Sequence, residues 1–247
     1  RKQNFNIESL EIVNWENVHL IEKKFDWIVA CSVETSIGLK LDIKELKKIS
    51  TKTKSKLFLD AIASIGLESD HDLADVLCFS SCKGLFGLTG GSFIAFDKDP
   101  ENEVKSFYLN VFTHLEKKVT GPYHTILSLD HVLKNHENLK YSVLVNKEKF
   151  INIAQKYLTY PNYHQPLLCT AVKGKIKNYD EKSIPYIPRD SKGLDVICHL
   201  GEVHLGKDAK GTILAGLFID WIDRKIIYLL YNIIIRALKK PICLLFE

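Results

Sequence analysis

Leu57-Phe-Leu-Asp60 is a short apolar run that ends on a carboxylate, and the predicted fold can be built outward from it. Similar runs follow at 75–80 (Asp-Val-Leu-Cys-Phe-Ser) and 92–96 (Ser-Phe-Ile-Ala-Phe), and one precedes it at 26–33 (Asp-Trp-Ile-Val-Ala-Cys-Ser-Val). Short continuous runs rich in β-formers are typical of buried strands. The four runs therefore predict one sheet, with 26–33 as a buried strand. The stretch 67–74 has room only for a loop or a single turn.

The segment that follows the run 26–33 has the pattern of an amphipathic helix. Asp42 is a suitable N-cap, and Glu45 stands three residues later at the capping-box position. Ile43, Leu46 and Ile49 share one face of this helix. A solvated helix face accounts better than a basic binding patch for the lysines on the other side, at positions 44, 47, 48, 52 and 54. Strands that alternate with helical connections predict α/β layers with a mainly parallel sheet.

From about residue 123 the pattern changes to longer helical segments. The apolar residues predict two amphipathic helices, around 126–133 and around 150–158. A strand is predicted at 167–172. We therefore expect a large domain over 1–122, and a connecting helix with a smaller C-terminal α+β domain over 123–247.

The sequence also allows predictions for two further segments in the second half of the chain. Residues 179–192 are mostly polar and hold two prolines, so they predict a loop. Residues 226–235 are strongly apolar, but a run of about ten residues is too short to span a bilayer. We interpret this run as a buried or interface helix rather than a membrane contact.

Composition narrows the function classes. Of the 247 residues, 46% are hydrophobic and 26% are charged, the balance of a globular protein. The net charge of +4 is too small to favour nucleic acid as the main partner. The six cysteines are scattered and form no second pair at metal-ligand spacing, so we expect reduced thiols, a cytoplasmic location and no metal. The polar segment 1–9 is unlike a signal peptide.

Polar side chains follow three of the predicted strands. They are Thr35 after the first strand, Asp60 after the second, and Ser80, Ser81 and Lys83 after the third. In an open α/β sheet the ligand site lies outside the carboxyl ends of the strands, so these groups are expected to converge there.

The three kinds of group suit a cofactor bound through a Schiff base. Burial lowers the pKa of a lysine such as Lys83 and makes its amine nucleophilic. A carboxylate such as Asp60 can hold a cationic ring nitrogen, and hydroxyls with glycine amides suit a phosphate. The residues alone leave an alternative open, in which Lys83 reaches into solvent and Asp60 caps a turn.

Three motifs in order resemble class V aminotransferases, enzymes of fold type I that use pyridoxal 5′-phosphate (PLP). They are Val33-Glu-Thr-Ser-Ile-Gly38, Phe58-Leu-Asp-Ala-Ile-Ala-Ser-Ile-Gly66 and Ser80-Ser-Cys-Lys-Gly-Leu85. Thr120-Gly-Pro-Tyr-His124 and Leu200-Gly-Glu-Val203 are similar to later segments of 2-aminoethylphosphonate–pyruvate aminotransferases. The resemblance therefore implies transfer of an amino group from a small amine or amino acid to a 2-oxo acid such as pyruvate.

The resemblance also implies a role for each site residue. Lys83 would bind the cofactor covalently, and Asp60 would pair with its pyridinium nitrogen. Thr35 would lie near its phenolic oxygen, and Ser80 or Ser81 near its phosphate. Thr120 would reach the phosphate in the neighbouring subunit, which implies a homodimer with shared sites.

This sequence departs from the family pattern in three places. Cys82 stands before the lysine, where the family often has Gln, His or Asn. Val196 stands where an arginine usually binds the substrate carboxylate, which leaves Arg189, seven residues earlier, as the substitute. Only residues 1–32 precede the first motif, so we expect the N-terminal part of the large domain to be missing from the sequence. The alternatives are a catalytically inactive remnant that serves as a partner subunit, or another PLP reaction such as cysteine desulfuration.

Overall fold

The computed structural model describes residues 9–99, 110–117, 121–161, 168–172 and 196–200. The chain divides into two compact units. One combines Arg1–Val33 with Lys40–Leu129, and the other combines Glu34–Leu39 with Asp130–Glu247.

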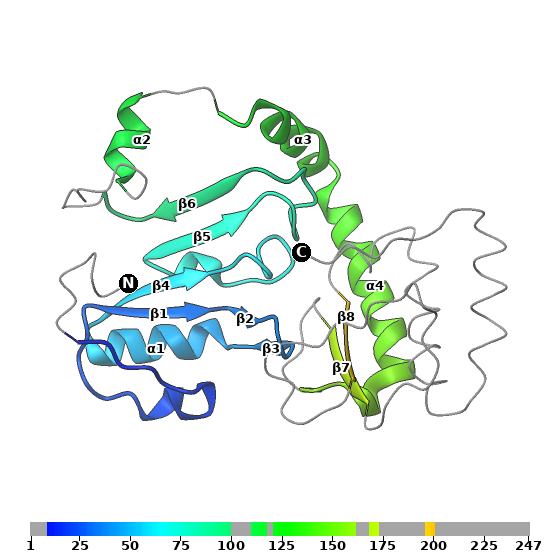
Figure 1. The fold of residues 1–247 in the computed structure, drawn as a ribbon, viewed down its shortest axis with the longest axis horizontal. Coiled ribbons are helices and arrows are strands. Elements are labelled where there is room, and N and C mark those ends of the chain that lie inside the picture. Colours follow the sequence, from blue (N-terminus) through cyan, green and yellow to red (C-terminus); the bar gives the residue numbers. More distant parts are fainter. Residues whose placement is uncertain (1–8, 100–109, 118–120, 162–167, 173–195, 201–247) are drawn as a thin grey trace, which may run out of the picture. The chain divides into compact units, whose positions relative to one another are not determined.

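The first unit is built on a four-stranded sheet in the order β1-β4-β5-β6 (Figure 1). Its strands are β1 (Trp27–Cys31), β4 (Lys56–Asp60), β5 (Val76–Ser80) and β6 (Ser92–Phe96). The strands β1, β4 and β5 are parallel, and β6 is antiparallel to β5. The four predicted strands and the mainly parallel sheet are confirmed. The carboxyl ends of the three parallel strands consequently lie along one edge of the sheet.

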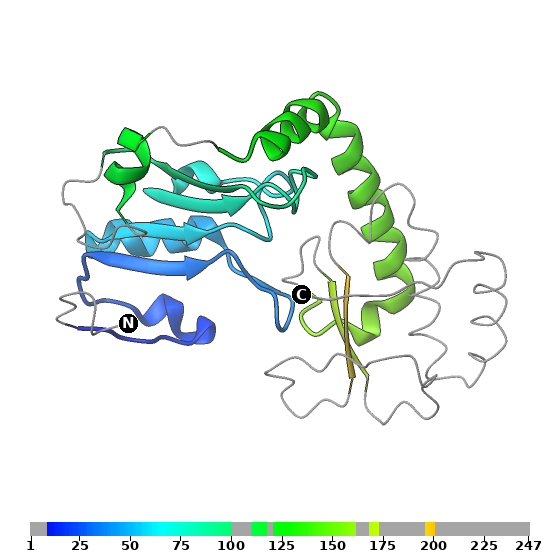
Figure 2. The same ribbon diagram turned by 45° about the horizontal axis from the view of Figure 1, so that its top comes forward.

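Helix α1 (Ile43–Thr53) covers one face of this sheet (Figure 2). It begins after Asp42, whose Oδ1 accepts the backbone N–H groups of Lys44 at 2.8 Å and Glu45 at 3.2 Å. It ends at Lys54, which adopts the left-handed conformation with φ 55°. The predicted helix and its apolar face are confirmed. The core between helix and sheet consists of Ile28, Ile43, Leu46, Ile49, Leu57, Leu59 and Ala74.

Strand β1 was predicted to be buried, and this is wrong for one of its faces. Ile28 packs into the core under α1. Trp27, Val29 and Cys31 point to the opposite face and are exposed, Val29 by 70%. A continuous apolar run indicates a strand, but it does not indicate how many of the strand's faces are covered.

Turns, 3₁₀ helices and short helices precede, connect and follow the strands of the first unit. Between β4 and β5 the chain makes turns and the 3₁₀ turn η2 (His71–Leu73), as expected for 67–74. The 3₁₀ helix η1 (Trp15–Leu20) precedes β1, and the helices α2 (Val111–Lys117) and α3 (Tyr123–Leu133) follow β6. The short strands β2 (Val33–Glu34) and β3 (Leu39–Lys40) form a separate two-stranded sheet.

The second unit contains the long helix α4 (His136–Ala154), the 3₁₀ turn η3 (Gln155–Tyr157), and the antiparallel strands β7 (Leu168–Val172) and β8 (Val196–Leu200). The strand predicted at 167–172 is confirmed.

Helix α4 begins far before the predicted 150–158. Its first half buries only Val143, so the apolar period there is too weak to see in the sequence. The predicted loop 179–192 and the apolar run 226–235 lie outside the described residues. No helix in the described part of the chain has the length and apolarity needed to cross a membrane.

Candidate functional site

Asp60 stands at the carboxyl end of β4, on the sheet face opposite α1. Leu57 and Leu59 point into the core, and successive side chains of a strand alternate between its faces. Asp60 is therefore directed to the open face, where it is half-buried. Its Oδ1 accepts the N–H of Ile62 at 2.9 Å, and Cys31 Sγ lies 3.8 Å from its Oδ2.

Two cysteines flank Asp60 in register. Asp60 is paired with Cys31 of β1 on one side and with Cys78 of β5 on the other. Burial, and secondarily the negative charge of Asp60, raises the pKa of the Cys78 thiol above its ordinary value. The Cys78 thiol therefore stays protonated at neutral pH, beside the carboxylate.

Lys83 lies in a tight turn that follows β5. The Lys83 carbonyl accepts the N–H of Phe86 at 2.8 Å, and a Cβ on Gly84 would lie 2.2 Å from the Ile65 carbonyl oxygen. Only glycine permits this approach, which holds the Lys83 turn against the turn that follows Asp60. Of the two alternatives left open for Lys83, burial and exposure to solvent, the structure shows exposure. It lies three residues beyond the last strand residue, Ser80, rather than within the sheet.

The two serines before Lys83 have different environments. Ser81 is fully buried, and its Oγ donates to the Leu88 carbonyl at 2.6 Å and meets the N–H and C=O of Gly91 at 3.3 Å. Its hydroxyl closes the loop that carries Lys83. Ser80 is half-buried, with its Oγ 3.7 Å from Cys82 Sγ. Of the two serines, Ser80 remains the candidate for a phosphate contact.

Thr35 belongs to the second unit, so its convergence with Asp60 and Lys83 stays a prediction. It lies in the turn between β2 and β3. Glu34 Oε1 orders this turn by accepting the N–H of Ser36 at 3.0 Å and its hydroxyl at 2.6 Å. Gly38 ends the turn with φ +70°, and a Cβ there would lie 2.3 Å from Cys169 Cβ. The glycine of this motif is therefore required both by its conformation and by the space available.

Thr120 and Arg189 lie outside the described residues. Val196, at the position of the family's arginine, is the first residue of β8.

A buried polar chain beneath Asp60 was missed by the sequence analysis. Ser32 donates to the Asp60 carbonyl through its N–H at 2.8 Å and through its Oγ at 3.0 Å. Ser32 Oγ lies 2.6 Å from Ser64 Oγ, which lies 2.8 Å from His71 Nε2. All three side chains belong to buried residues. The sequence feature that could have indicated this chain is Ser64, which occupies the serine position of the Asp60–Gly66 motif.

Solved structures establish the fold. The chain aligns with pyridoxamine–pyruvate aminotransferase from Mesorhizobium loti at TM-score 0.62 and 14% identity, covering 84% of this chain and 62% of that chain. An aspartate aminotransferase of subgroup IV from Thermus thermophilus gives TM-score 0.61 and 16% identity, with coverages of 86% and 68%. A cysteine desulfurase from Thermococcus onnurineus NA1 gives 0.50 and 15%, with coverages of 66% and 48%.

The chain thus spans about half to two thirds of the length of these structures. No protein-family model matches it, and the curated proteins contain no significant match. The structural likeness confirms the predicted fold of a mainly parallel sheet layered with helices, as in these aminotransferase structures.

Proposed function

We propose that this chain is a PLP-dependent aminotransferase that moves an amino group between a small amine or amino acid and a 2-oxo acid. One observation carries the proposal. The Asp60 carboxylate stands on the open face at the carboxyl ends of parallel strands, and Gly84 holds the Lys83 turn against the turn that follows Asp60. The aminotransferases among the similar structures support the same reaction class.

The residues present fit this cofactor. Asp60 is a carboxylate whose Oδ1 accepts the Ile62 N–H and whose Oδ2 lies 3.8 Å from Cys31 Sγ, and this Oδ2 would hold the protonated pyridine nitrogen. Lys83 is an exposed residue in a turn closed by the hydrogen bond from the Phe86 N–H to its carbonyl. Ser80 offers a half-buried hydroxyl for the phosphate. When bound, PLP supplies an electron sink for charge that develops on the substrate.

Each of these residues has its own role in the proposed reaction. The Lys83 amine would bind the cofactor covalently, give way to the substrate amine, and then carry the proton from the substrate α-carbon to the cofactor's C4′. Asp60 would keep the ring nitrogen protonated throughout. Thr35 would donate to the phenolic oxygen and thereby orient the ring.

The finer assignments rest on the sequence resemblance. We propose 2-aminoethylphosphonate as amino donor, pyruvate as acceptor, and Arg189 as the carboxylate-binding residue. Thr120 would complete the phosphate site of a neighbouring subunit, so the active form would be a homodimer. We further propose a cytoplasmic location.

The test is the visible absorbance of the purified full chain incubated with PLP. We expect a yellow band in the parent and in the control Lys98→Ala, which removes another exposed lysine, and no band in Lys83→Ala. Reduction with borohydride followed by peptide mass spectrometry should place the cofactor on Lys83. Amino donors are then screened, starting with 2-aminoethylphosphonate, and cysteine is included to test desulfuration. A folded chain without the band would contradict the proposal and favour an inactive partner subunit.

A further inference from the structure

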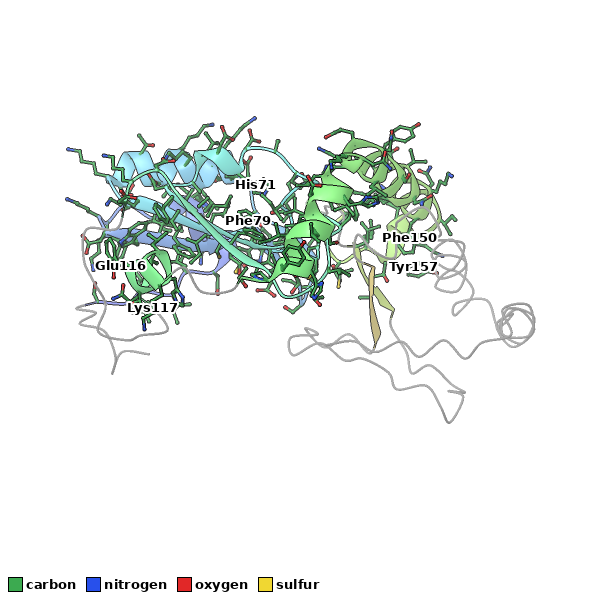
Figure 3. All side chains as sticks on the ribbon, turned by 90° about the horizontal axis from the view of Figure 1, so that it is seen from above. His71, Phe79, Glu116, Lys117, Phe150 and Tyr157 are labelled. Atoms are coloured by element: carbon green, nitrogen blue, oxygen red, sulfur yellow. The ribbon has the colours of Figure 1, made fainter. Side chains whose placement is uncertain are left out.

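Lys83 lies in the loop 81–91, which joins β5 to β6. The two strands are paired up to both ends of this loop. The ring of Phe79 in β5, labelled in Figure 3, stacks on the ring of Phe93 in β6 at a centroid distance of 5.2 Å. The sheet therefore fixes the two ends of the loop, and the position of Lys83 depends on what holds the residues between them.

The backbone of this loop is strained at Phe86. Its φ is +61°, in the left-handed region that bulky residues rarely adopt. Its N–H donates to the Lys83 carbonyl at 2.8 Å, so the strained residue closes the turn that contains the lysine. A residue in such a conformation persists only where the surrounding structure holds it. The Lys83 turn therefore depends on contacts from outside the turn.

Helix α3 supplies such contacts from its first two turns. Thr125 Oγ1 donates to the Thr89 carbonyl at 3.0 Å, and Ser128 Oγ accepts the Leu88 N–H at 3.0 Å. Thr125 is buried and Ser128 is half-buried. Both hydroxyls bind the backbone of the loop, so they fix the course of the chain just after the strained turn.

Two glycines allow α3 to approach the loop closely. A Cβ on Gly87 would lie 2.7 Å from Leu129 Cδ2, and a Cβ on Gly91 would lie 2.8 Å from Thr125 Cγ2. A methyl group at either position would press against the helix. Because these glycines flank residues 88–89, the helix packs against the loop on both sides of the two hydrogen bonds.

We propose that Thr125 and Ser128 are positioning residues for Lys83. They hold the loop backbone and thereby the strained turn at Phe86, so that the Lys83 amine stands where it can react. The inference rests on the proposed function, in which this amine bonds to the aldehyde carbon of PLP and one water molecule leaves. The contacts between α3 and the loop do not depend on that function.

Amide hydrogen exchange of the cofactor-free full chain tests these contacts. In Ser128→Ala the Leu88 N–H loses its acceptor, so the peptide that covers 84–91 should exchange about tenfold faster. Thr125→Val keeps the shape of the side chain but removes the donor to the Thr89 carbonyl, and it should act in the same direction. If the buried Thr125→Val does not fold, Ser128→Ala decides the test.

Two matched substitutions on other helices are the controls. Ser142→Ala removes a hydroxyl that donates to the Asn138 carbonyl of its own helix at 3.0 Å. Thr51→Val removes one that donates to the Lys47 carbonyl of its own helix at 2.9 Å. Neither hydroxyl bond reaches the loop 81–91, so both variants should exchange there as the parent does.

Two forms of the cofactor distinguish the positioning of Lys83 from a general loosening of the fold. PLP carries the aldehyde that reacts with the lysine, whereas pyridoxamine 5′-phosphate has the same ring and phosphate but an amine in its place. In Ser128→Ala and Thr125→Val we expect the dissociation constant for PLP to rise about tenfold, and that for pyridoxamine phosphate to change by less than about twofold. Lys83→Ala should show the same pattern more strongly.

Each outcome bears on a separate part of the proposal. Equal weakening of both cofactor forms, or no weakening of PLP binding, overturns the positioning role. Unchanged exchange of the loop in both variants overturns the contacts of α3. A parent chain that binds neither cofactor form contradicts the proposed function, and the exchange result then decides whether α3 holds the Lys83 turn.

Discussion

Cys31 Sγ lies 3.8 Å from Asp60 Oδ2, across the paired strands β1 and β4. Cys31 is exposed, although it belongs to a sheet strand, because it points to the face that α1 does not cover. The two residues therefore occupy the same open surface at the carboxyl ends of the strands. A reagent that reaches Cys31 reports on whatever lies over Asp60.

Bound PLP should protect Cys31 from alkylation. The proposed function puts the cofactor ring against Asp60, where it would cover the neighbouring thiol. At a PLP concentration about ten times its dissociation constant, iodoacetamide labelling of Cys31 should slow about tenfold. The measurement is the labelling rate of the Cys31 peptide by mass spectrometry. Inorganic phosphate is the control and should not protect, and an unchanged rate with PLP bound would place the cofactor elsewhere.

The local elements were predictable because local patterns specify them. Asp42 marks the start of α1, and the alternation of Leu57 and Leu59 with their neighbours marks β4. What could not be predicted depends on contacts between distant segments. The exposure of Val29 depends on which face a helix covers, and the distinction between Ser80 and Ser81 depends on a loop that returns at Gly91. These contacts leave no periodic signal in the sequence.

The polar chain beneath Asp60 was unpredictable for the same reason. His71 meets Ser64 only because the turns between β4 and β5 bring η2 back under the motif. The sequence left open whether Lys83 is buried or exposed, because the end of β5 cannot be fixed to one residue by composition. An apolar run followed by polar residues predicts that a site lies near, but not which of its side chains is covered.

Ser81→Ala should destabilise the fold, whereas Ser80→Ala should not. The Ser81 hydroxyl is buried and serves the Leu88 carbonyl and the Gly91 N–H, so its removal takes this partner from both groups, whereas the Gly91 carbonyl keeps the N–H of residue 81. The expected loss is about 1–3 kcal/mol in the free energy of unfolding. Ser80→Ala should change it by less than about 0.5 kcal/mol and should instead weaken PLP binding. Urea unfolding measures the first effect, and a stable Ser81→Ala would contradict the loop-closing role.

Gly84→Ala should displace the Lys83 turn. The added methyl group would lie 2.2 Å from the Ile65 carbonyl oxygen and 2.8 Å from Leu67 Cγ, so the backbone must move. Overpacking of this kind typically costs about 1–3 kcal/mol, and here the shift also moves the lysine. The matched control is Gly121→Ala, where the nearest atom is Ile126 Cδ1 at 4.0 Å. We expect reduced stability and loss of the PLP absorbance in the first variant only. Equal melting temperatures for the two variants would show that the turn is not held by this contact.

Asp75, the residue that precedes β5, holds the beginning of β4 through both its side chain and its backbone. Its Oδ2 accepts the Leu57 N–H at 2.7 Å and the Lys47 ammonium at 3.3 Å, and its own N–H donates to the Leu57 carbonyl at 2.9 Å. Burial by itself raises the pKa of this carboxyl. The Leu57 N–H and Lys47 outweigh that effect, so the net pKa lies below its ordinary value of 3.8.

Replacement of Asp75 should therefore remove a contribution to stability that depends on pH. Because the pKa of Asp75 is lower in the folded state, the carboxylate stabilises the fold above about pH 4, and the effect disappears as pH falls through the folded pKa. Asp75→Ala leaves the N–H of the fully buried Leu57 unpaired, so we expect a loss of about 1–3 kcal/mol at pH 7. Asp75→Asn keeps an acceptor and removes only the charge, so its smaller deficit should disappear as pH falls through the lowered pKa of Asp75, whereas that of Asp75→Ala persists. Urea unfolding of both variants at several pH values, with the exposed Asp99→Asn as control, measures this. A deficit in Asp75→Asn that is constant with pH would show that the charge has no part in holding β4 to β5.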